Sequence, residues 1–269
     1  MIRPPAVAGT FYPSDPRELA RQIDEFTSAA MPVAKIAARG CLVPHAGYMY
    51  SGHVAGEVFA SIEIPARCIL LGPRHYPRGE AMAILTEGSF ATPLGEAQID
   101  SALARELAYE YPLLREDAVA HEREHSLEVE IPFLQRLAGD FRFVPVVLAT
   151  DRYPAIEQLG RALARVVAAQ NDLVLVVASS DLNHYESEAI TRAKDELAIA
   201  RILALDPQGL YDTVRREPIT MCGYAATVAM LVAMRELGAT RVRLVRHATS
   251  ADMNGDRERV VGYAGIVVV

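Results

Sequence analysis

Cysteine is scarce in this chain of 269 residues, and its positions show no spacing pattern. The three cysteines are Cys41, Cys68 and Cys222. An odd, small number argues against a disulfide framework and for a reducing compartment. The N-terminal residues 1–5 also lack the apolar stretch with which a signal peptide continues. We therefore expect a cytoplasmic protein.

Other signals are absent as well. No apolar run reaches the roughly 18 residues that span a bilayer. The formal net charge is −7, and no cluster of Lys or Arg forms a basic segment. We therefore expect neither membrane insertion nor nucleic-acid binding. No G-x-G-x-x-G motif follows a strand candidate and no Walker-type loop is present, so a nucleotide cofactor is not indicated. The lack of a G-x-S-x-G elbow argues against acyl transfer.

Hydrophobic residues make up 51% of the chain, enough for a sizeable core, and short apolar runs alternate with helical patterns. This alternation predicts an α/β fold with a mostly parallel central sheet and helices on both faces. No shift in composition divides the chain, so we expect a single domain over residues 1–269. The predicted strands are Cys41–Pro44, Arg67–Leu71, Ala81–Leu85, Phe143–Leu148, Leu173–Ala178, Arg241–Val245 and Val260–Val268. The predicted helices are Pro16–Thr27 (capped by Asp15), His53–Ile62, Ser101–Tyr111, Ser126–Leu137, Tyr153–Ala169, Ser187–Ala204, Pro207–Arg216 and Gly223–Leu237; a surface loop is expected over 29–40.

Polar side chains follow three of these strands, where an open α/β sheet binds its ligands. His45 follows the first predicted strand, His75 follows the second, and Asp181 and His184 follow the strand that ends at Ala178. Any one of these histidines alone could be an ordinary loop residue. Three at equivalent positions instead indicate a shared site.

Imidazole is the commonest protein ligand of zinc, copper and iron. Two histidines and one anionic ligand leave coordination positions open for water, oxygen or a substrate. Asp181 could orient an imidazole or bind the metal itself, and His184 could act as a general acid and base.

Cys222 immediately precedes a predicted helix. A cysteine at a helix N-terminus has a lowered pKa and becomes a better metal ligand. The alternative is a small apolar side chain packed under the helix, and the local sequence does not decide between the two. For Cys41 and Cys68, inside predicted strands, we expect the packed role.

The segment His121–His125 matches the zinc-protease motif H-E-x-x-H. That motif needs both histidines on one face of a packed helix, and the intervening Arg123 and Glu124 are too polar for such a face. Ser126 looks like the cap of a new helix. His125 therefore lies at a helix entrance, where it either contacts the site or remains a solvated loop residue.

Six ordered motifs across the chain resemble the Memo family: RPPAVAGTFYP (3–13), VPHAGY (43–48), LGPRH (71–75), EHSLE (124–128), SSDLNHY (179–185) and CGY (222–224). The resemblance implies a fold similar to class III extradiol dioxygenases, with one metal ion per chain. It implies His45, His75 and Cys222 as metal ligands and Asp181 and His184 as catalytic residues, with His125, Tyr48 and Tyr185 around the substrate. Association with AMMECR-type and radical SAM proteins is implied by the AmmeMemoRadiSam members.

The resemblance also suggests a reaction. Cys222 stands where the dioxygenases carry a carboxylate, and a thiolate favours copper or zinc more than a carboxylate does. Our first hypothesis is an iron(II)- or copper-dependent redox enzyme that acts with O2 on a small substrate. The second is a protein that keeps the pocket to bind a peptide or small molecule, and the third is a zinc hydrolase.

Overall fold

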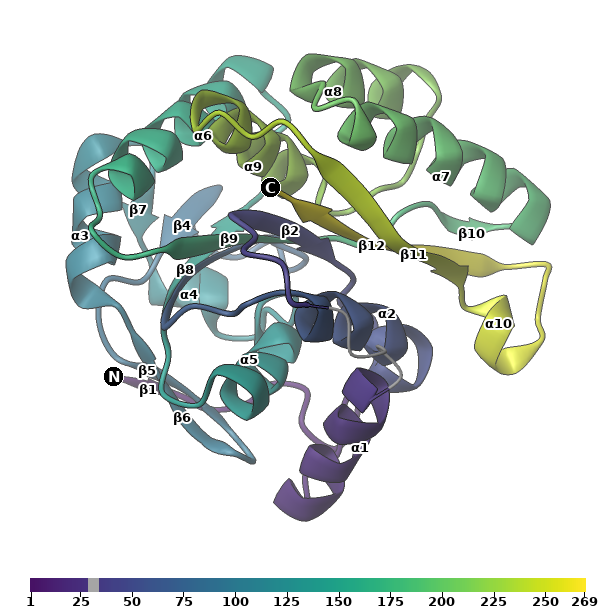
Figure 1. The fold of residues 1–269 in the computed structure, drawn as a ribbon, viewed down its shortest axis with the longest axis horizontal. Coiled ribbons are helices and arrows are strands. Elements are labelled where there is room, and N and C mark those ends of the chain that lie inside the picture. Colours follow the sequence, from purple (N-terminus) through teal and green to yellow (C-terminus); the bar gives the residue numbers. More distant parts are fainter. Residues whose placement is uncertain (29–33) are drawn as a thin grey trace.

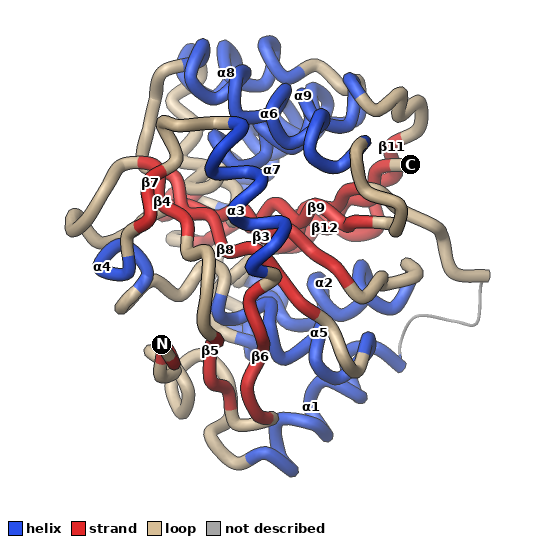
Figure 2. Tube along the Cα trace, turned by 90° about the vertical axis from the view of Figure 1, so that its left-hand side faces the viewer, coloured by secondary structure: helices blue, strands red, loops and turns tan. Residues whose placement is uncertain are grey.

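The computed structural model describes residues 1–28 and 34–269, and its centre is a mixed sheet with helices on both faces (Figure 1; Figure 2). The strands are β1 (Ile2–Arg3), β2 (Gly40–Val43), β3 (Arg67–Pro73), β4 (Met82–Ile84), β5 (Ser89–Thr92), β6 (Gly95–Ile99), β7 (Arg115–Glu116), β8 (Arg142–Leu148), β9 (Val174–Ser179), β10 (His184–Glu186), β11 (Val242–Thr249) and β12 (Val260–Val268). The helices are α1 (Pro16–Ser28), α2 (Tyr48–Ser61), α3 (Ser101–Glu110), α4 (Ala118–His121), α5 (Ile131–Ala138), α6 (Tyr153–Ala168), α7 (Glu188–Leu203), α8 (Pro207–Arg216), α9 (Tyr224–Glu236) and α10 (Ala251–Asn254), with a 3-10 turn η1 (Glu128–Glu130).

The middle of the sheet is parallel. Its order is β6-β8-β3-β9-β2, and every neighbouring pair in that run is parallel. α6, α7, α8 and α9 cover one face, whereas α1, α2 and α5 cover the other (Figure 2). Strands covered on both faces carry apolar side chains throughout, and β9 is buried at all six positions. The predicted α/β fold is confirmed.

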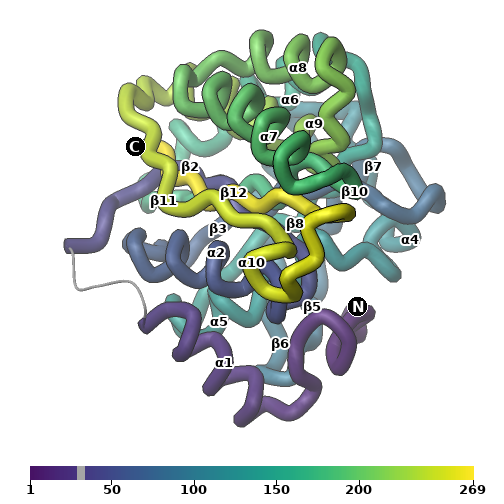
Figure 3. The backbone as a smooth tube through the Cα atoms, turned by 90° about the vertical axis from the view of Figure 1, so that its right-hand side faces the viewer, coloured from purple at the N-terminus to yellow at the C-terminus, as the bar shows by residue number. Residues whose placement is uncertain are grey.

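The sheet edges differ from the prediction. β12 pairs antiparallel with β2, and β10 and β11 both pair antiparallel with β12, so the C-terminal strands close one side of the sheet (Figure 3). All seven predicted strands are present: Val260–Val268 has the predicted bounds, and the other six are shifted at one or both ends. The short strands β1, β5, β6, β7 and β10 were not predicted, because two to five residues give too little periodicity to detect.

Two helix starts were also wrong. The helix expected from His53 already begins at Tyr48, and Gly52 lies inside it. A Cβ on Gly52 would overlap the ring of Phe26, so the glycine permits the close approach of α1 and α2. The helix expected from Ser126 begins as η1, because the Ser126 hydroxyl bonds to the Pro73 carbonyl instead of capping the helix.

Asp15 caps α1, since its Oδ1 accepts from the backbone N–H groups of Arg17 and Glu18 at 2.9 Å. Of the surface loop expected over 29–40, residues 29–33 lie outside the described residues. No helix in the described part of the chain combines the length and apolar character that a membrane crossing needs.

A buried carboxylate ties the N-terminal segment to the core. Glu128, in η1, is fully buried and pairs with Arg3 at 2.7 Å. Its oxygens also accept from the backbone N–H groups of Ala6 and Val7 and from the Tyr12 hydroxyl. Because all these donors converge on one side chain, the path of residues 3–12 depends on it.

We expect Glu128→Gln to lower the free energy of unfolding by about 3–5 kcal/mol, because the change leaves the buried Arg3 guanidinium without its counter-charge. Chemical denaturation at pH 7 measures this. Glu25→Gln is the control, since its pair with Arg21 is exposed on α1 and should be worth less than about 0.5 kcal/mol. Equal, small effects of both changes would contradict the anchoring role of Glu128.

Candidate metal centre

The predicted site residues lie at one edge of the sheet. β9 lies between β3 and β2, and all three strands run parallel, so their carboxyl ends are adjacent. His45 follows β2, His75 follows β3, and Asp181 follows β9. Together with His184 they line one pocket of about 480 Å³.

Three imidazoles meet in this pocket: His45, His75 and His125. One ring nitrogen from each lies within 4.8 Å of the other two, which is the spacing of a set of metal ligands. The ring centroids of His45 and His75 are 5.2 Å apart, and the rings of His75 and His125 stack at 4.5 Å. His45 is buried, whereas the His75 and His125 side chains are 30% and 14% exposed.

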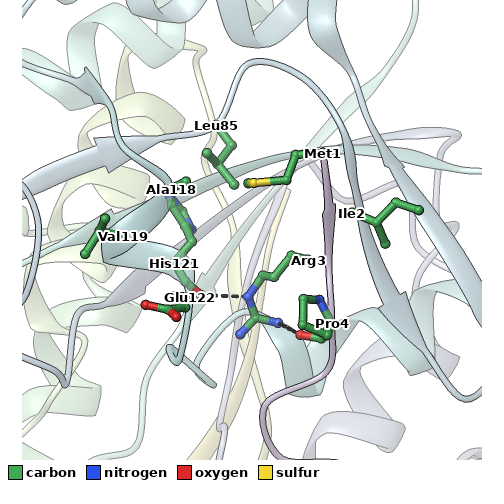
Figure 4. A pocket seen from close by; sticks show the side chains of 9 residues that line it. All are labelled: Met1, Ile2, Arg3, Pro4, Leu85, Ala118, Val119, His121 and Glu122. Carbon is green, nitrogen blue, oxygen red and sulfur yellow. Dashed lines mark hydrogen bonds between the residues drawn. The ribbon is translucent and has the colours of Figure 1, made fainter.

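His125 reaches the cluster from an irregular segment, not from a zinc-protease helix. α4 ends at His121, and the chain then turns before η1 begins. His121 instead lines a separate cavity of about 320 Å³, beside Met1 and Leu85 (Figure 4). There its carbonyl accepts from Arg3 at 2.6 Å, and burial lowers the pKa of its imidazole to about 3. His121 and His125 therefore line different cavities and do not share one helix face. This confirms that the H-E-x-x-H sequence is not a zinc-protease motif here.

Cys222 lies beside the histidine cluster but outside it. Its Sγ is 3.2 Å from His45 Nε2, yet among the described residues the set of mutually close ligand atoms contains the three histidines without it. The surroundings of Cys222 oppose the lowered pKa that a helix N-terminus would favour. Burial, together with the nearby Asp181 carboxylate, raises the pKa of the Cys222 thiol. Without a metal, Cys222 is therefore a neutral thiol.

Asp181 and His184 face the same pocket. Asp181 Oδ1 accepts from the backbone N–H of His45 at 2.9 Å, so the carboxylate fixes the chain that carries His45. Burial raises the pKa of Asp181. The His184 backbone N–H donates to Thr220 Oγ1 at 2.7 Å, whereas its ring Nδ1 is buried without a hydrogen-bond partner in the described structure.

The two predicted tyrosines differ in position. Tyr185 lines the pocket at 65% exposure, in a left-handed backbone conformation with φ of 63°. Tyr48 does not line it: the side chain is buried against Phe133 and its hydroxyl donates to the Val129 carbonyl at 2.7 Å. The expectation that Tyr48 lies around the substrate is therefore wrong, because the side chain is part of the core. Residues not singled out from the sequence complete the pocket wall, among them Phe11, Tyr50, Arg259 and Tyr263.

Glu124 is a further residue that the sequence analysis missed. Its buried carboxylate accepts from His75 Nδ1 at 2.8 Å and from the backbone N–H groups of His75 and Ser126. A histidine held through Nδ1 presents Nε2 to a metal. Burial is the largest single effect and favours the neutral acid, but the side-chain and backbone hydrogen bonds from His75 and the interactions with the His75 and His125 rings together outweigh it and lower the pKa of Glu124 to about 2. A glutamate in a polar stretch gives no sequence signal that it is buried.

The donor set fits a transition-metal ion. Metal ligands must be unprotonated. Burial and the neighbouring histidines lower the pKa of His45, and burial lowers that of His125 to about 4, so both rings are neutral at pH 7. His125 Nδ1 is also buried without a hydrogen-bond partner among the residues that the structure describes. Imidazole nitrogens, with a thiol nearby, suit zinc, copper or iron.

The lowered pKa of Glu124 predicts that its contribution to the unfolding free energy depends on pH. A carboxyl group whose pKa is lower in the folded state stabilises the fold above its unfolded pKa, and this is lost as the pH falls towards the folded value. We expect the difference in unfolding free energy between the native chain and Glu124→Gln to shrink by about 2 kcal/mol from pH 7 to pH 3. Denaturation of chelator-treated protein measures this. Glu122→Gln, at a side chain 61% exposed, should give a small difference at both pH values. A gap for Glu124→Gln that does not change with pH would refute the assignment.

Comparison with known proteins identifies relatives over the whole chain. A family model described as Memo-like protein matches residues 3–267. A MEMO1 family protein of Methanopyrus kandleri is 40% identical over 279 aligned residues, which cover 99% of this chain and 99% of that protein. A MEMO1 family protein of Aquifex aeolicus is 40% identical over 267 residues, with 99% and 98% covered.

A solved structure shares the fold. The crystal structure of an uncharacterized protein from Escherichia coli K12 is similar with a TM-score of 0.57 and 14% sequence identity, over 83% of this chain and 98% of that one. At this identity the likeness concerns the fold alone. The family model and the full-length relatives establish that the chain belongs to the Memo family.

Proposed function

We propose that this Memo family chain is an iron(II)- or copper-dependent redox enzyme that acts with O2 on a small substrate. The observation that carries the proposal is the convergence of His45, His75 and His125 in one open pocket. Three imidazoles at one point have no structural need to meet, because each ring could bond to the backbone instead. Their arrangement is that of a ligand set with positions left open.

The residues that line the pocket have separate roles in this proposal. His45 and His75 hold the metal, with His125 or Cys222 as the third ligand. The ion, when bound, supplies redox chemistry and Lewis acidity. Asp181 fixes the backbone of His45. His184 Nδ1, which lacks a partner within the described residues, accepts or releases a proton of the substrate.

The pocket limits the substrate to a small molecule. A volume of about 480 Å³ lies in the range of small-molecule sites. Phe11, Tyr50, Tyr185 and Tyr263 contribute aromatic walls, and aromatic rings stack or pack edge-to-face on such walls. A catechol-type ring therefore fits both the size and the lining of the pocket.

Elemental analysis of anaerobically purified protein tests the ligand set. We expect the native chain to carry about one iron or copper ion, as the three-nitrogen cluster implies, and His45→Ala and His75→Ala to lose most of it. His125→Ala and Cys222→Ser decide which side chain is the third ligand. His53→Ala, on α2 and outside the pocket lining, is the control and should keep the metal. Native metal content in both His45→Ala and His75→Ala would contradict the proposed site.

Oxygen consumption with a panel of catechol-type substrates tests the reaction. We expect His184→Gln to keep its metal but to slow turnover by about 10²–10⁴-fold, the usual contribution of a general acid and base. His53→Gln should match the native rate. A metal-loaded protein without turnover on any substrate would favour a binding role for the pocket. Zinc content with hydrolysis of an ester or amide would favour a hydrolase.

A further inference from the structure

We infer that Ser179 is a positioning residue that holds His45 as the Nδ1–H tautomer, with Glu130 as a neutral acid on its other side. The Nε2 lone pair of His45 then points to the metal position. That last step rests on the proposed function, because it takes His45 as a ligand. The tautomer itself is a property of the chain without metal.

Ser179 lies at the carboxyl end of β9, and its hydroxyl has three polar neighbours. Its Oγ is 2.8 Å from His45 Nδ1, 2.7 Å from the Ser126 carbonyl oxygen and 3.0 Å from Glu130 Oε1. Ser179, Ser126 and Glu130 are all buried. Bulk solvent does not reach these groups, and the three bond to one another.

Counting protons decides the arrangement. A serine hydroxyl donates one hydrogen and accepts two. The Ser126 carbonyl can only accept, and it is the nearest neighbour, so it takes the Ser179 proton. His45 Nδ1 must then donate to Ser179 Oγ, which makes Nδ1 the protonated nitrogen of a neutral ring. Any arrangement in which Ser179 donates to His45 leaves the Ser126 carbonyl without that bond, at a cost of about 1–3 kcal/mol for a buried group.

Glu130 fits this arrangement only as a carboxylic acid. With the Ser179 proton on Ser126, Glu130 Oε1 bonds to Ser179 by donating its own proton. Its Oε2 is buried without a hydrogen-bond partner in the described structure, and an ionised carboxylate would leave charge on that atom. Burial raises the pKa of Glu130 well above its usual range, with the nearby Asp181 adding to the effect.

The consequence for His45 is a ring fixed on several sides. Its backbone N–H bonds to Asp181 and its Nδ1–H to Ser179, so Nε2 carries the lone pair, which faces the Cys222 thiol at 3.2 Å. His75 reaches the same tautomer through the charged Glu124. One histidine is thus oriented by a carboxylate and the other by an uncharged serine and acid.

Long-range ¹H–¹⁵N spectra of the histidine rings in chelator-treated protein test the inference directly. We expect His45 to be the Nδ1–H tautomer in the native chain and in Glu130→Gln, whose amide can still donate to Ser179. Ser179→Ala should shift His45 towards Nε2–H. Glu124→Gln is the matched control and should change His75 but not His45. A native His45 in the Nε2–H form, or one unaffected by Ser179→Ala, would overturn the inference.

Infrared difference spectra and metal titration complete the test. The native chain minus Glu130→Gln should contain the C=O band of a protonated carboxylic acid, and a carboxylate band in its place would exclude the neutral Glu130. Zinc titration should give about 10–100-fold weaker binding for Ser179→Ala, as expected when the group orienting a ligand is removed. A shifted tautomer with unchanged zinc affinity would sustain the positioning by Ser179 and contradict His45 as a ligand.

Discussion

The parallel pairing of β3, β9 and β2 is the constraint on which the rest of the structure depends. It places three carboxyl ends side by side, so residues more than a hundred positions apart in the chain share one pocket. An antiparallel β9 would send Asp181 and His184 to the opposite edge of the sheet. Burial of the strands on both faces makes their register rigid, and this rigidity passes to the histidines that follow them.

A second organising feature is the short segment from Glu124 to Glu130, which carries three buried glutamates with separate partners. Glu124 orients His75, Glu128 anchors the N-terminal segment through Arg3, and Glu130 meets Ser179. Buried carboxyl groups are expensive unless they are hydrogen-bonded, so the segment is held in place by the contacts it provides. The same segment brings His125 to the cluster.

The sequence predicted the fold and most of the pocket for a physical reason. Apolar runs identify buried strands, and a polar side chain directly after such a run lies at the sheet edge, which was sufficient for His45, His75, Asp181 and His184. Long-range contacts carry no such local signal. Glu124 and Tyr48 show this in opposite directions, because a polar stretch hid a buried carboxylate and a motif tyrosine lies in the core. A lowered pKa for Cys222 would follow from its place at a helix start alone. Desolvation of the buried thiol acts in the opposite direction and raises the pKa.

Exposure decreases in steps across the histidine cluster. The His75 side chain is 30% exposed, that of His125 14%, and His45 only 2%. An ion that diffuses in from bulk water would therefore meet the most exposed imidazole, His75, first and the buried His45 last. The order in which the three ligands become accessible is therefore set by their depth in the pocket, with His75 nearest to solvent and His45 deepest.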